Sequence, residues 1–117
     1  MPLPEVLQEQ VDMLRTAATK ANAINYRSLV TNANSHLGTI RQYIEHDDGI
    51  MDALTEAMTK CEELADEIQD QGVMGMKGNS ALDNARSQAL LAVEVLEREL
   101  RAAKPNAVAA ALGVAWM

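Results

Sequence analysis

Carboxylates are concentrated in one segment of this chain. Ten of its seventeen Asp and Glu residues lie between Glu45 and Asp70, where Lys60 is the single lysine or arginine. The segment therefore has a formal charge of −9, and the remaining residues together carry +2. A one-sided field of this kind attracts a basic partner, a cation or a nucleic-acid-binding surface. The overall charge of −7 argues against direct binding of nucleic acid by this chain.

Seven of the carboxylates fall on one side of a helical projection, opposite an apolar seam. Within the helix this row lacks the mixed signs that give most solvent faces their i, i+4 ion pairs. Two interpretations stay open: a solvated face that needs no partner, or a docking face for a basic surface, with carboxylates about 5–6 Å apart imitating the phosphates of a nucleic acid. The predicted partner-binding residues are Glu45, Asp48, Asp52, Glu56, Glu63, Asp66 and Asp70.

Two pairs of these carboxylates also have a spacing that suits a metal. Glu45–Asp48 and Glu63–Asp66 are both acid-x-x-acid pairs, and two helices carrying such pairs can hold Mg²⁺ between them when they face each other. Here the chain resembles the MazG-like all-α nucleotide pyrophosphohydrolases, whose pattern is Glu-x-x-Glu followed by Glu-x-x-Asp, with Asp48 in place of a glutamate. The resemblance implies metal-dependent hydrolysis with these four residues as ligands. Apart from it, we predict no metal, cofactor or catalytic residue.

The elements that must position these residues are helices. The chain has nineteen alanines, no phenylalanine, one tryptophan and two tyrosines. Alanine is the best helix former but buries little apolar surface, so this composition predicts thin helices that pack closely. No segment of useful length alternates apolar and polar residues, which excludes a recognisable strand. The predicted class is all-α.

The apolar spacing divides the 117 residues into one domain with three parts. Residues 1–46 form the N-terminal helices, either as one long helix or, as we favour, as two that meet near residues 32–35. Residues 50–71 and 80–104 form a helical hairpin of about 33 and 37 Å, with Asp48 as the N-cap of its first helix and Gly72 at that helix's end. Together they predict an antiparallel bundle of three to four helices, followed by an apolar tail, 105–117, as a short helix or strap.

The single cysteine, the first residues and the length of the apolar runs limit the possible chemistry and location of the protein. Cys61 is the only cysteine, so an internal disulfide is excluded, and its place on the apolar seam favours a buried, inert side chain. The first residues lack the basic and apolar regions of a signal peptide, and no apolar run is long enough to span a bilayer. These features predict a location in the cytoplasm or in an assembled particle, without membrane insertion.

The tail and the glycine-rich loop bear on function. Val108, Leu112 and Trp116 are the predicted tail contacts, either with the bundle itself or with another subunit. Met76-Lys-Gly78 is similar to the Trp-x-Gly turn of the WXG100 secreted helical hairpins, with Met76 in place of the tryptophan. We predict a non-enzymatic structural or interaction protein, a subunit of a virion-type or secretion-type assembly or an oligomer. The alternatives are an acidic inhibitor acting through the Glu45–Asp70 face and the MazG-like hydrolase.

Overall fold

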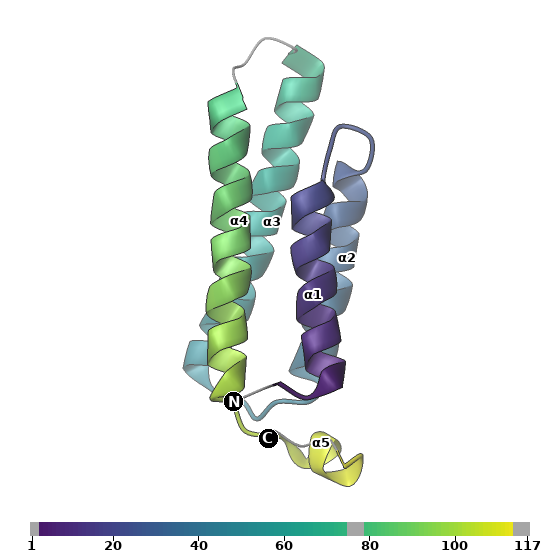
Figure 1. Ribbon diagram of the computed structural model, residues 1–117, viewed down its shortest axis with the longest axis vertical. Helices are drawn as coiled ribbons and strands as arrows, with labels where there is room; N and C mark the ends of the chain where they lie inside the picture. Colours follow the sequence, from purple (N-terminus) through teal and green to yellow (C-terminus); the bar gives the residue numbers. More distant parts are fainter. Residues whose placement is uncertain (1–2, 75–78, 114–117) are drawn as a thin grey trace.

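The chain folds into an up-down-up-down bundle of four helices, followed by a fifth, short helix (Figure 1). This computed structural model describes the backbone of residues 3–74 and 79–113, and their side chains except those of 71–74 and 79. Within those residues the helices are α1 (Glu5–Lys20), α2 (Tyr26–Arg41), α3 (Asp48–Met74), α4 (Asn79–Arg101) and α5 (Ala107–Ala111). The prediction of an all-α antiparallel bundle around a long hairpin, with a short apolar C-terminal helix, is confirmed.

The four long helices form a closed ring. α1 packs on α2, α2 on α3 and α3 on α4, and α1 closes the ring against α4 through the least extensive of these interfaces. The α3–α4 hairpin extends well beyond the α1–α2 turn, and α5 lies at the opposite end of the bundle (Figure 1). The molecule measures 51 × 21 × 20 Å, since α3 alone has 27 residues and is about 40 Å long.

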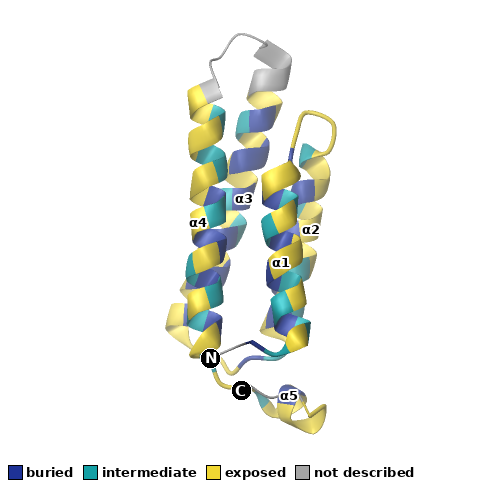
Figure 2. Ribbon diagram, viewed as in Figure 1, coloured by how far each residue is buried: buried dark blue, intermediate teal, exposed yellow. Residues whose placement is uncertain are grey.

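One apolar stripe of each helix builds a single core along the bundle axis (Figure 2). The largest fully buried side chains include Leu7, Leu14, Ile40, Leu64 and Leu96. Alanines alternate with them, and because a methyl group is small, the helix backbones can approach closely there. No polar or charged side chain is buried among the described residues, so the core provides packing and positions the surface, without polar chemistry of its own.

The break between the N-terminal helices exists, but the predicted position near residues 32–35 is wrong. That stretch lies inside α2, where the polar side chains face solvent and Ala33 keeps the core stripe continuous. The chain turns at residues 21–25 instead. Asn22 Oδ1 accepts the backbone N–H of Ile24 at 2.8 Å and that of Asn25 at 3.1 Å, and Asn25 Oδ1 accepts the N–H of Asn22 at 2.8 Å. These bonds offer the backbone an alternative to helix, which is why α1 ends there.

The start of α3 also differs from the prediction by one residue. Asp48 is the first helical residue, and the capping side chain is Asp47. Asp47 Oδ1 accepts the backbone N–H of Ile50 at 3.2 Å, and its carbonyl accepts that of Met51 at 2.9 Å. Glycine at position 49 leaves room for this cap, because a Cβ there would stand only 3.1 Å from Asp47 Oδ1.

The hairpin helices end elsewhere than predicted. α3 continues through Gly72 to Met74, because one glycine inside a helix costs only about 0.5–1 kcal/mol. α4 already includes Ser80 and ends at Arg101, three residues before Lys104. Proline disfavours helix for the residue before it, so the segment ahead of Pro105 leaves the helix early. In the part of the chain described, no helix is both long and apolar enough to span a membrane.

Candidate functional site

The carboxylate row lies on the outer face of the bundle. Six of the seven predicted partner-binding residues belong to α3, and Glu45 precedes the helix in the α2–α3 connection. All seven are exposed, while the seam on the opposite side of α3 is buried. The exposed row comprises Glu45, Asp48, Asp52, Glu56, Glu63, Asp66 and Asp70.

The row contains ion pairs that the sequence interpretation left out. Lys60 Nζ lies 3.3 Å from Glu63 Oε2 and 3.8 Å from Glu56 Oε1. His46 Nε2 lies 3.5 Å from Asp48 Oδ1, at the start of the helix. Exposed pairs of this kind contribute at most about 1 kcal/mol each. A single lysine therefore bridges two carboxylates without reversing the charge of the row.

The two acid-x-x-acid pairs do not come together. Asp48 and Glu63 lie on the same helix, fifteen residues apart, a rise of about 22 Å. Glu45 and Asp48 are thus near one end of α3 and Glu63 and Asp66 are towards the other. Among the described residues, no group of three or more His, Cys, Asp or Glu side chains is arranged to hold a metal ion. The facing pair of helices that the MazG-like resemblance implies is not formed by these four residues.

The C-terminal helix is held at its base and exposed beyond it. Asn106 donates its backbone N–H to Tyr43 O at 3.1 Å and its side-chain Nδ2 to Gln42 O at 2.8 Å. Next to it, an antiparallel bridge joins Ile44 and Pro105, and Asn106 Oδ1 also caps α5 by accepting the N–H of Ala109 at 2.9 Å. The α4–α5 connection is therefore tied by backbone pairing to the α2–α3 connection.

Two of the three predicted tail contacts lie in the described part of the chain, and both are more than half exposed. Val108 is 52% exposed and Leu112 is 64% exposed, while Ala109 is the buried residue of α5. Trp116 lies outside the described residues. The part of the tail that the structure describes is thus not a strap across the core, and its two large apolar side chains face solvent.

A shallow groove runs between the outer edges of α3 and α4, and the sequence interpretation missed it. It encloses ≈ 120 Å³ and is lined by Ala53, Glu56, Gln88, Leu91, Ala92 and Val95. Leu91 is 57% exposed, although it is a large aliphatic residue in a long helix. The exposure of Leu91 was predictable from the sequence, because the apolar period of α4 through Val93, Leu96 and Leu100 leaves Leu91 on the opposite side of the helix; the position of α3 beside it was not.

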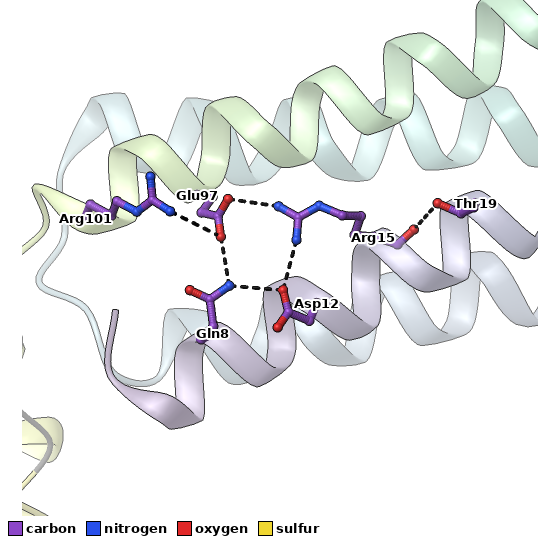
Figure 3. A network of polar contacts seen from close by, with 6 residues as sticks. All are labelled: Gln8, Asp12, Arg15, Thr19, Glu97 and Arg101. Atoms are coloured by element: carbon purple, nitrogen blue, oxygen red, sulfur yellow. Dashed lines mark hydrogen bonds and ion pairs between the residues drawn. The ribbon is translucent and has the colours of Figure 1, made fainter. Parts of the chain in front are cut away.

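A polar network joins α1 to α4 on another face (Figure 3). Glu97, only 14% exposed, accepts Arg15 Nη2 at 2.9 Å and Gln8 Nε2 at 2.8 Å. Asp12 accepts the second Arg15 nitrogen at 2.9 Å, and Arg101 lies 3.7 Å from the Glu97 carboxylate. Every group in it contacts an oppositely charged or complementary neighbour, so the network fastens the two helices.

The titratable groups with shifted pKa values are not arranged as a reactive site. Burial raises the pKa of the Cys61 thiol to about 11, and the nearby charge of Glu62 adds to the effect. A thiol held in its protonated form is a poor nucleophile. Burial lowers the pKa of His36, whose Nδ1 lies 2.7 Å from Gln10 Oε1. His36 also lines an open groove between α1 and α2, together with Met13 and Asn32.

No protein-family model, no curated protein and no solved structure matches this chain. Its function must therefore be argued from the two surfaces described above: the apolar end of the molecule at α5, and the acidic outer side of the α3–α4 hairpin.

Proposed function

We propose that this chain is a non-enzymatic structural or interaction protein, a subunit that joins a larger assembly or oligomer through α5. The observation that supports this most is the combination of a fixed base and an exposed apolar surface. Asn106 and the Ile44–Pro105 bridge tie the helix to the bundle, yet Val108 and Leu112 are more than half exposed.

The energetics favour a partner at this end. Full burial of one aliphatic side chain contributes about 1.5–3 kcal/mol, so covering both would give a useful part of a specific interaction. Because the hydrogen bonds at Asn106 already order the base of the helix, little additional ordering is required when a partner binds. A virion-type or secretion-type particle, or a cytoplasmic complex, would provide such a partner.

The test compares three forms of the full chain by light scattering and by cross-linking in the native source. We expect the Val108→Ser/Leu112→Ser variant to lose the self-association or the cross-linked partner of the original chain. The Ile24→Ser variant should retain it, because Ile24 is also apolar and 94% exposed but lies in the distant α1–α2 turn. If the α5 variant and the original chain have the same mass and the same cross-links, the proposal is wrong.

The carboxylate row supports a second candidate function, an acidic inhibitor or regulator that docks a basic surface. All seven predicted residues are exposed, and the six in α3 lie opposite the buried seam of that helix. Binding of this kind weakens steeply as salt screens the charges. Changing Asp52 and Asp66 to Asn, and Glu56 and Glu63 to Gln, should abolish capture of a basic partner; capture that survives all four changes would exclude this function.

A further inference from the structure

The groove between α3 and α4 combines an apolar floor with a charged rim. Leu91, Val95 and Ala92 of α4 line it together with Ala53 of α3. Glu56 lines the α3 edge. Asp52 lies one helical turn before Glu56 on the same face, and both carboxylates are exposed. Lys60 Nζ lies 3.8 Å from Glu56 Oε1, so the α3 side of the apolar surface has two carboxylates and one lysine and keeps a net negative charge.

We propose that this groove binds an amphipathic helix of a protein partner, with apolar residues on one face and lysines or arginines flanking them. The inference rests on the proposed function insofar as the chain acts by binding other proteins. A helix fits because a groove between two antiparallel helices accepts a third along its length, with side chains spaced at i, i+3, i+4 and i+7 as anchors. The partner's apolar face covers Leu91 and Val95, and its cations meet Asp52 and Glu56.

Charge favours a basic helix in this groove over two other candidate occupants, a second copy of the groove and the α5 segment of another copy. A second copy carries the same −7, and pairing two such grooves brings carboxylates towards carboxylates, which is unfavourable. The exposed segment α5 of another copy, Ala107–Ala111, has no cation to meet Asp52 and Glu56. A basic helix satisfies both the apolar floor and the acidic rim.

The test uses a labelled synthetic helix with leucines at heptad spacing and flanking lysines, and a matched peptide in which glutamates replace the lysines. Fluorescence anisotropy measures the binding of each to the full chain. We expect the lysine peptide to bind with an affinity that falls steeply as salt is raised, and the glutamate peptide to bind at least about tenfold more weakly. No binding of the lysine peptide, or equal binding of both, overturns the proposal.

Four variants locate the site. Leu91→Asn should weaken the lysine peptide about tenfold, because it removes apolar surface from the contact, whereas Ile24→Asn should leave the affinity unchanged. Asp52→Asn/Glu56→Gln should weaken it several-fold more than Glu9→Gln/Glu94→Gln, which removes the same charge from exposed positions on α1 and α4. Circular dichroism confirms that each variant is folded.

Other results of these experiments would contradict the proposed site or its proposed occupant. If both charge pairs weaken the peptide equally, the attraction is diffuse and the groove is not its site. If Leu91→Asn has no effect on the peptide, or instead converts a dimer of the chain to a monomer in light scattering, the proposed occupant is wrong. Val108→Ser/Leu112→Ser should leave the peptide affinity unchanged, so failure at α5 and failure at the groove are distinguishable.

Discussion

At the scale of single residues, the structure separates side chains that hold the fold from those that remain available to a partner. Cys61 belongs to the first group: it is fully buried on the seam of α3. Asp47 belongs there too, since its carboxylate satisfies an amide at the start of that helix. Asp52 and Leu91 are exposed and make no contribution to the core.

The buried thiol should be inert and should make the fold sensitive to alkali. Its pKa is raised from 9.0 to about 11, so the folded state retains the thiol proton where the unfolded state has lost it. Stability from this group is fully present below pH 9 and is lost as pH rises towards 11. We expect thiol reagents to modify Cys61 only on unfolding, and Cys61→Ala to lose less stability than the original chain over that pH range. Rapid modification of the folded chain would contradict this.

Two adjacent aspartates provide a test of the helix cap. Asp47→Ala should lower the free energy of unfolding by about 1 kcal/mol, because the N–H of Ile50 loses its acceptor. Asp48→Ala should lower it by only a few tenths, since that exposed carboxylate caps no amide and interacts only with the helix dipole and with His46 at 3.5 Å. Urea denaturation measures both. If Asp48→Ala instead lowers the free energy of unfolding more than Asp47→Ala does, then Asp48 is the capping residue.

At the scale of helices, the seam of α3 was predictable because apolar residues recur at 3.6-residue spacing over more than four turns. All six seam residues are buried: Ile50, Leu54, Ala57, Cys61, Leu64 and Ile68. The α1–α2 break was misplaced because local hydrogen bonds of Asn22 and Asn25 decide it, and counting polar residues does not reveal them. The groove beside Leu91 was not predictable, because a helical projection shows which face is apolar but not which neighbour lies at each edge.

Arg86 joins α4 to the end of α1 through three hydrogen bonds. From α4 its guanidinium donates to the carbonyls of Ala18, Thr19 and Ala21 at 2.7, 2.9 and 3.0 Å, at the C-terminal end of α1. These carbonyls lack helical partners and carry the negative end of the dipole.

Arg86→Met should therefore lower the free energy of unfolding by about 2 kcal/mol. Arg86→Lys should recover little of this, because an ammonium cannot span three carbonyls as the guanidinium fork does. Arg98→Met, at an exposed arginine on the same helix, is the control and should change stability by less than about 0.5 kcal/mol. Urea denaturation gives all three values, and equal losses for Arg86→Met and Arg98→Met would contradict the role of Arg86.

At the scale of the whole molecule, the positions of the charges describe its binding surfaces better than the net charge does. The network at Glu97 balances acids with bases between α1 and α4. The outer side of α3 keeps its excess, and no basic residue lies in the last turn of that helix to offset it. α5 itself has no charged residue and exposes Val108, whereas the outer side of α3 is acidic, so the molecule has two surfaces of different chemistry.

The uneven charge along α3 predicts that removing one carboxylate changes the free energy of unfolding in opposite directions at the two ends of the helix. Asp70→Asn should raise the free energy of unfolding by about 0.3–1 kcal/mol, because it removes an anion near the negative end of the dipole. Asp48→Asn should lower it by a similar amount, because its carboxylate lies at the positive end. Urea denaturation measures both, and added salt should reduce both effects. If both variants are stabilised alike, repulsion across the whole molecule governs stability, and the position of each carboxylate along α3 does not.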